Sequence, residues 1–214
     1  VGNPRRAMES YRALLDDAAE GVSSVRAELV TQIKLPMGWR GDCQSAGGGV
    51  LLYSGLGMLD ILIEVAGLPE SVYAAIQTDR PASGDTTTPV HDTDDTVMAV
   101  LHSGTNPIGQ LYATRRGGES REWIESTSSR GTVLASEAGG DAAEAAACRE
   151  ALAFAHSVAA GEANSDQAAR LLLAHATVEA MYLSAQTQRP ESPYQQLQIH
   201  GVSLEQCYPA KAEE

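Results

Sequence analysis

The feature that most constrains this chain is a long apolar stretch that opens with three consecutive glycines, residues 47–49. Only two charged residues interrupt the segment 50–67 that follows. Glycine permits tight turns and close backbone approach, and an apolar run of this length predicts a buried helix. Gly55 and Gly57 lower helix propensity by about 1 kcal/mol each. We therefore expect either close packing or a ligand lying against the backbone, with Gly49 as a candidate contact.

Composition excludes several classes of protein. The chain has 214 residues, 43% of them hydrophobic, and a net charge of −13. Binding to a nucleic-acid backbone requires a basic face, which this sequence lacks. Three widely spaced cysteines match no zinc site and no disulfide framework, so we expect free thiols and a cytoplasmic protein. The apolar stretch is long enough to span a membrane, but its charges and glycines favour a core helix and no membrane partner.

The expected elements run in the order helix, strand, helix, several strands, two helices. Hydrophobic spacing predicts helices over residues 4–20, 47–67, 141–160 and 165–186, and strands over 22–35, 71–78, 93–102, 108–114, 120–128 and 132–136. Short connections after the third and fourth of these strands favour antiparallel neighbours. Residues 79–92, rich in Thr, Pro, Gly and Asp, are expected to form a mobile loop.

This order indicates an α+β fold with a mostly antiparallel open sheet and helices packed on one face. We expect a single domain over residues 1–188 and a polar C-terminal tail over 189–214. An open sheet face is commonly used for association.

Several segments in the same order resemble the Gfo/Idh/MocA oxidoreductases, specifically their C-terminal domain. The glycine run followed by Val50-Leu-Leu and a later Leu59-Asp60 pair resembles the start of that domain's helix. Similar pieces are the opening Asn3-Pro-Arg-Arg, the strand start at Ser24-Val-Arg-Ala-Glu, Asp94-Asp-Thr before an apolar strand, and Glu179-Ala-Met-Tyr in the last helix.

The resemblance implies NAD(P)-dependent hydride transfer on a sugar, polyol or related small molecule, and an oligomer formed through the open sheet face. In the family, an aspartate usually stands at the position of Tyr53 and a histidine at that of Gly57. The chain has no Gly-x-Gly-x-x-Gly sequence between a strand and a helix. It therefore resembles the C-terminal half alone, which binds no cofactor by itself and would need NAD(P) from a Rossmann-containing partner domain or subunit.

The candidate catalytic residue is Tyr53, whose phenol can donate a proton or orient a hydroxyl. Candidate substrate contacts are Arg40, Gly49, Gly57, Asp60 and His102. Each has a structural alternative: an aromatic core residue for Tyr53, an ion pair for Arg40, and a salt-bridged helix edge for Asp60 with Glu64. No metal site is expected.

One further polar cluster, residues 91–95, has the sequence His-Asp-Thr-Asp-Asp and could poise a base or bind calcium. A turn before a strand, with Asp95 as a cap, is the alternative.

Three functions remain open from the sequence. The chain is the substrate-binding and oligomerisation half of an oxidoreductase, a non-catalytic relative that serves as a subunit or ligand-binding protein, or a cofactor-free lyase or isomerase. Loss of both usual polar positions in the helix favours the second.

Overall fold

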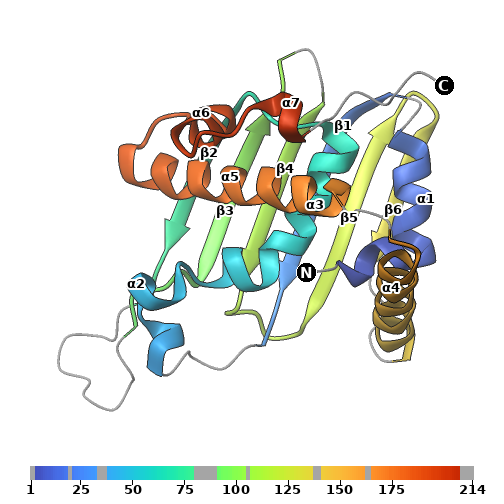
Figure 1. The fold of residues 1–214 in the computed structure, drawn as a ribbon. Helices are drawn as coiled ribbons and strands as arrows, with labels where there is room; N and C mark the ends of the chain where they lie inside the picture. The colour runs from blue at the N-terminus through green and yellow to red at the C-terminus, as the bar shows by residue number, and fades with distance from the viewer. Residues whose placement is uncertain are drawn as a thin grey trace.

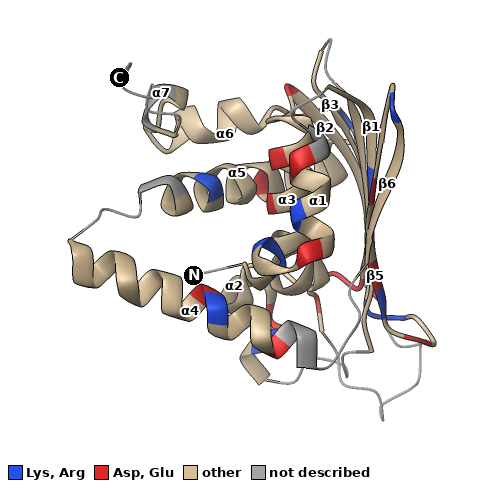
Figure 2. Ribbon diagram, turned by 90° about the vertical axis from the view of Figure 1, so that its right-hand side faces the viewer, with Lys and Arg blue, Asp and Glu red and all other residues tan. Residues whose placement is uncertain are grey.

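The fold is an open sheet with helices on one side, seen in a computed structural model that describes residues 3–18, 21–32, 38–79, 91–104, 107–136, 141–161 and 165–207. Figure 1 shows the sheet behind the helices, and Figure 2, turned by 90°, shows that the other sheet face has no helix over it. The α+β fold with helices on one face is therefore confirmed. The elements are η1 (Pro4–Ala7), α1 (Glu9–Ala18), β1 (Val22–Val30), η2 (Gly38–Gly41), α2 (Cys43–Ala46), η3 (Leu51–Gly55), α3 (Leu56–Ala66), β2 (Ser71–Gln77), β3 (Thr96–His102), β4 (Ile108–Thr114), β5 (Arg121–Ser128), β6 (Gly131–Ser136), α4 (Asp141–Ala160), α5 (Ser165–Thr187), α6 (Pro193–Ile199) and α7 (Leu204–Cys207).

The six strands lie in the order β2-β3-β4-β1-β5-β6. Four of the five pairings between these described strands are antiparallel, and β1 pairs with β4 in parallel. The sheet is thus mostly antiparallel, as expected.

The expectation that the strands at 108–114 and 120–128 are neighbours is wrong, because β1 lies between them. The inward-facing residues of β1, Val25, Ala27 and Leu29, are all buried. A strand with such a buried face is more stable in the interior of a sheet, where neighbouring strands form hydrogen bonds with both of its edges. The short β4–β5 connection crosses the end of β1, where Gly117 packs against Val30 so closely that a Cβ would overlap the valine side chain.

The N-terminal helix is divided. Its first part is the 3₁₀ turn η1, which ends at Ala7. The backbone of Met8 is extended (φ −82°, ψ 138°), and α1 begins at Glu9. Tyr11 and Leu14 of α1 are fully buried. The strand predicted over 22–35 ends at Val30, and the described residues 31–32 lie beyond it. Residues 19–20, residues 33–35 and most of the loop predicted over 79–92 lie outside the described residues.

The apolar segment Cys43–Ala66 is long and apolar enough to cross a membrane by length and composition alone, but 67% of its apolar 18-residue window is buried inside the fold. Its α3 portion packs on β1 and against α5. Met58, Leu59, Ile61 and Leu62 are completely buried there. This is the behaviour of a core helix, as the charges in the segment predicted.

The segment after residue 188 contains more structure than a polar tail. Val72 and Glu191 form an antiparallel bridge that adds a short piece beside β2. Helices α6 and α7 pack on α5 and bury Leu197 and Cys207 in a small second core. The apolar residues of these short helices are few, which is why composition alone indicates a tail.

Candidate functional site

The helix that carries the candidate site begins at a group of polar contacts, the glycine-turn cluster, made by Asp94, Tyr182 and the backbone of Gly49 and Leu51. The Asp94 carboxylate accepts hydrogen bonds from the Gly49 N–H (2.5 Å), the Leu51 N–H (2.8 Å) and the Tyr182 hydroxyl (2.6 Å). The first N–H groups of a helix have no partner within the helix, and Asp94 satisfies two of them. Burial, and then the negative charge of Asp94, raise the pKa of Tyr182, so the phenol stays protonated and donates.

At two positions of the glycine run, atoms of this cluster lie so close to the backbone that only glycine fits. A Cβ at Gly49 would overlap the Asp94 backbone, and a Cβ at Gly48 would overlap the Tyr182 hydroxyl. Close packing therefore explains Gly49, and the space beside it is filled by protein rather than left for a ligand.

The next turn, η3, is a π-helical turn that carries Tyr53. Such turns are rare and occur frequently at functional sites. The side chain of Tyr53 is 49% exposed, an unusual position for an aromatic residue on the most apolar helix of the chain. The turn thus places the candidate catalytic phenol at the surface rather than in the core.

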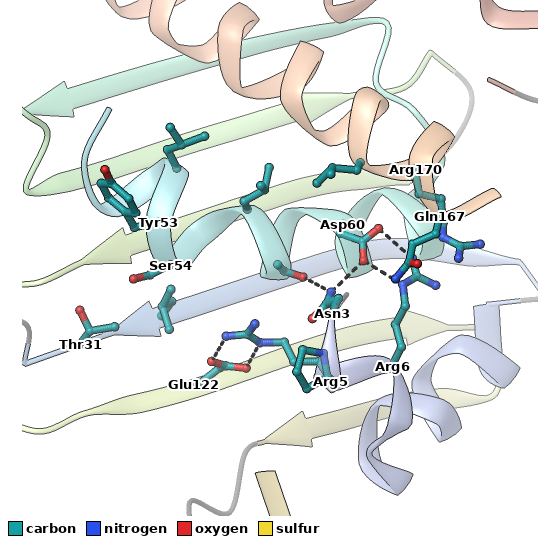
Figure 3. A pocket seen from close by; sticks show the side chains of 16 residues that line it. Asn3, Arg5, Arg6, Thr31, Tyr53, Ser54, Asp60, Glu122, Gln167 and Arg170 are labelled. Atoms are coloured by element: carbon teal, nitrogen blue, oxygen red, sulfur yellow. Dashed lines mark hydrogen bonds and ion pairs between the residues drawn. The ribbon is translucent and has the colours of Figure 1, made fainter. Parts of the chain in front are cut away.

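A pocket of about 470 Å³ lies along this side of the helix. Figure 3 shows its wall: Tyr53 and Ser54 at one end, Asp60, Arg6, Gln167 and Arg170 at the other, and Asn3, Arg5, Glu122 and Thr31 beneath the helix. The wall is built from Asn3 and η1, β1 with Thr31 just after it, η3, α3, β5 and α5. Its volume falls within the usual range for small-molecule sites.

The floor of the pocket is held by what we call the pocket cluster: Asn3, Arg5, Arg6, Asp60 and Glu122. Arg6 donates twice to the Asp60 carboxylate (2.8 and 2.9 Å), and Asn3 Nδ2 donates to the same carboxylate (2.7 Å). Arg5 makes a two-pronged ion pair with Glu122, in which its Nη2 lies 2.6 Å from the carboxylate. Figure 3 shows both arginines reaching from the chain start to acids on other elements.

Two neighbours extend the pocket cluster. Arg6 also donates to Glu64 (2.8 Å), so one guanidinium joins the two acids of α3. The buried Tyr11 hydroxyl donates to Glu122 (2.6 Å). The salt-bridged helix edge considered for Asp60 and Glu64 is therefore present, and Asp60 lines the pocket as well.

Gly57 makes room for Arg5. A Cβ at this position would lie 2.5 Å from Arg5 Nη1 and 3.3 Å from Asn3 Oδ1. The site where the resemblance implies a histidine is thus crowded by a guanidinium and an amide from the N-terminal segment.

Three of the six predicted site residues, Tyr53, Gly57 and Asp60, meet in the pocket. Arg40 lies outside it, exposed in η2, with its guanidinium 5.5 Å from the centre of the Trp39 ring. His102 is exposed at the end of β3, and its Nδ1 accepts a bond from the Gly104 N–H (3.4 Å). Together with Gly49, these residues are not brought to the pocket.

Sequence reasoning misses several wall residues: Asn3, Arg5, Glu122, Thr31, Gln167 and Arg170. The only sequence signal for the opening Asn3-Pro-Arg-Arg is its part in the family resemblance. The signal for the rest is weak, because Glu122 and Arg170 look like ordinary surface positions of a strand and a helix.

The polar run at 91–95 is structural in this fold. Asp94 belongs to the glycine-turn cluster, and the completely buried Asp95 pairs with Arg115 and with His91 Nε2 (3.0 Å). Burial alone would raise the pKa of Asp95, but the Asp79 N–H, His91 and Arg115 outweigh it and hold that pKa below its usual value. Within the described ranges, no group of three His, Cys, Asp or Glu side chains is arranged to hold a metal ion.

A dinucleotide does not fit the residues of this chain. Its sequence has no glycine fingerprint, and the glycine turn that it does have is filled by Asp94 and Tyr182.

Comparison with known proteins identifies the family. The model of the GFO/IDH/MocA C-terminal domain matches residues 12–134. The chain belongs to this family. No match was found among curated proteins.

Solved structures of family members share the fold. GenD2 from gentamicin A biosynthesis, in complex with NAD, is 18% identical with a TM-score of 0.75, and the match covers 89% of this chain and 62% of that one. A putative myo-inositol dehydrogenase from Sinorhizobium meliloti is 21% identical (TM-score 0.71; 90% and 64% covered). Levoglucosan dehydrogenase, in complex with NADH and levoglucosan, is 18% identical (TM-score 0.68; 89% and 63% covered). This chain thus spans less than two thirds of the length of these structures.

Proposed function

We propose that this chain is the substrate-binding and oligomerisation part of a GFO/IDH/MocA oxidoreductase that acts on a sugar, polyol or related small molecule. The observation that carries the proposal is the pocket of about 470 Å³ beside Tyr53 and Gly57, on the helix where the family resemblance implies the reacting groups. The structures that match this fold include a protein solved with NADH and levoglucosan.

The chemistry of the wall supports a polyhydroxylated ligand. Tyr53, Ser54 and Thr31 bring hydroxyl groups to one end of the pocket. The Thr31 hydroxyl and Asn3 Oδ1 are buried without a hydrogen-bond partner among the described residues. Buried polar atoms in this state are usually satisfied by water or a ligand. Alcohol groups, which both donate and accept, suit such a wall.

In this proposal Tyr53 orients a substrate hydroxyl and exchanges a proton with it. Arg5 polarises a second substrate oxygen; its guanidinium is fixed by Glu122 and occupies the space that the missing side chain of Gly57 leaves. Hydride transfer requires a nucleotide-binding domain, from another segment of the protein or from a partner subunit. The acidic composition and the free cysteines support a cytoplasmic setting.

The open sheet face supports association. Tyr73, Met98, Val100 and Ile108 are all exposed on adjacent strands, and no helix lies over this face in Figure 2. Exposed apolar patches of this kind mark interfaces. We propose a homo-oligomer formed through it, with a Rossmann-containing subunit as the alternative partner.

A non-catalytic role is the second candidate, and a specific contact favours it. A guanidinium crowds the site where the family resemblance implies a histidine. A cofactor-free lyase or isomerase using Tyr53 is a third candidate.

Calorimetric titration with D-sorbitol and myo-inositol tests the proposal. We expect saturable binding that Tyr53→Phe weakens by about five- to tenfold, the value of one hydrogen bond. Tyr73→Phe is the matched control, because Tyr73 is equally exposed, at 49%, but lies on the open face. Failure of every polyhydroxylated probe, neutral or charged, to bind would overturn the proposal, and binding unchanged in Tyr53→Phe would remove Tyr53 from the site.

Native mass spectrometry of the protein from its own host separates the candidate roles. A complex with a nucleotide-binding subunit or domain that retains NAD(P) supports the oxidoreductase. A homo-oligomer that binds polyols without nucleotide, and shows no turnover, supports the non-catalytic relative. Turnover without nucleotide that is lost in Tyr53→Phe supports the lyase or isomerase.

A further inference from the structure

The arginines of the pocket differ in whether an acidic side chain pairs with them. Three arginines line it, and two of them face acids: Arg5 pairs with Glu122, and Arg6 with Asp60. The third, Arg170, has no hydrogen bond or ion pair with any residue in the part of the chain that the structure describes. It is half-buried on α5.

Arg170 is placed to meet a ligand. It lies three residues after Gln167, so the two side chains share one face of α5. Both line the pocket, and Figure 3 shows them at the same end of the wall as Asp60 and Arg6. They stand at the opposite end of the pocket from Tyr53 and Ser54. The wall thus offers hydroxyl groups at one end and a guanidinium with an amide at the other.

A partly buried cation loses part of its hydration, and an opposite charge close to it offsets that loss. The acids of the wall, Asp60 and Glu122, are already each engaged by an arginine. Glu150 of α4, next to this end of the pocket, accepts a hydrogen bond from Gln167 Nε2 (3.4 Å) and forms no ion pair with Arg170. A planar guanidinium binds a carboxylate through two parallel hydrogen bonds. The missing partner of Arg170 is therefore best supplied from outside the chain, by an anion in the pocket.

We propose that the ligand of this pocket is a polyhydroxylated carboxylate, such as a sugar acid, with its carboxylate on Arg170 and its hydroxyl groups toward Tyr53. This inference rests on the proposed function, since it names the substrate class of the same pocket. A phosphate on a polyol would present similar chemistry to Arg170, so the test includes one.

The experiment compares D-gluconate with D-sorbitol, which has the same carbon chain without the carboxylate, and with D-sorbitol 6-phosphate. Binding to the 214-residue chain is measured by calorimetry. We expect D-gluconate to bind at least about tenfold more tightly than D-sorbitol, as a charge-assisted contact allows. Arg170→Gln should remove this preference, because it lowers the affinity for D-gluconate far more than the affinity for D-sorbitol.

Arg12→Gln is the matched control. It removes the same charge from an exposed position on α1, outside this pocket, so the preference for D-gluconate should persist. Circular dichroism and thermal melting establish that both variants fold.

Each remaining outcome decides against the inference in a different way. Equal binding of D-gluconate and D-sorbitol overturns it and leaves the proposed function standing. No binding of any probe overturns both. Tighter binding of D-sorbitol 6-phosphate than of D-gluconate, lost in Arg170→Gln, overturns the carboxylate and assigns a phosphate in its place.

Discussion

Two polar clusters hold the same apolar helical segment, and only one of them leaves space. The glycine-turn cluster gives three donors to the Asp94 carboxylate, and glycines close the remaining gap. The pocket cluster also pairs its acids with arginines, yet it stands beside a cavity of about 470 Å³.

This difference shows how a polar cluster that only stabilises the fold can be distinguished from one that binds a ligand. Both contain several hydrogen bonds to a carboxylate, so the number of polar contacts alone does not separate them. What separates them is the number of polar groups left without a partner. In the pocket wall, Arg170 and the buried oxygens of Asn3 and Thr31 have no hydrogen-bond partner within the described residues. The glycine-turn cluster builds the helix start, and the pocket cluster offers unused chemistry to a ligand.

The largest expected effect is loss of the glycine-turn cluster. Asp94→Ala leaves two backbone N–H groups and a buried phenol without their acceptor, so we expect a loss of about 3 kcal/mol or more in the free energy of unfolding. Urea denaturation measures it. Asp92→Ala is the control, because the Asp92 carboxylate accepts a hydrogen bond from the Cys43 N–H (2.6 Å) in an exposed region, and its loss should cost less than about 1 kcal/mol. Equal losses in the two variants would contradict the distinction between the clusters.

The second effect concerns the pocket cluster. Glu122→Gln keeps the side-chain volume but removes the charge opposite Arg5, so we expect a loss of about 2 kcal/mol in stability. Its carboxylate is 6% exposed, whereas Glu125 on the same strand is 33% exposed and lies 4.0 Å from Arg26. Glu125→Gln should therefore change stability by less than about 0.5 kcal/mol. Urea denaturation compares the two variants. A loss of stability for Glu122→Gln as small as that for Glu125→Gln would mean that water in the pocket screens the ion pair between Arg5 and Glu122.

Much of the fold follows from local pattern, and what does not is long-range. Alternating apolar residues predict β1, and helical spacing predicts α4 and α5 to within a residue or two of their bounds. The insertion of β1 between β4 and β5 could not be predicted, because strand pairing depends on contacts between distant segments. The two small helices after residue 188 carry few apolar residues, and their packing on α5 supplies most of what orders them.

The same distinction divides the candidate site. Tyr53, Gly57 and Asp60 share one helix face, a local property that spacing reveals. Arg40 is a candidate because it precedes the glycine turn, and His102 because it stands late in a strand that could face the open sheet surface. Their distance from the pocket depends on how the sheet and loops are arranged. Arg170 reaches the pocket from α5, which packs against α3 but lies far from it in the sequence, so no spacing rule connects it to the glycine helix.

The smallest expected effect tests why Gly57 is a glycine. Alanine at a helical glycine normally stabilises a protein by about 1 kcal/mol, and Gly55→Ala should show that gain, because its Cβ would meet nothing closer than 3.4 Å. Gly57→Ala gains the same propensity but displaces Arg5, so its net gain should be smaller by about 0.5–1 kcal/mol. Thermal and urea unfolding of the two variants measure the difference.

The cause of that difference can be isolated in an Arg5→Ala background. If the guanidinium is what crowds Gly57, removing it makes the two alanine substitutions equal, because only helix propensity then remains. If Gly57→Ala stays worse in that background, the segment at Asn3 is responsible, since Asn3 Oδ1 would lie 3.3 Å from the new Cβ. Equal gains in the original background would instead show that Arg5 moves aside freely, and its place in the pocket would then depend on the ligand rather than on the helix.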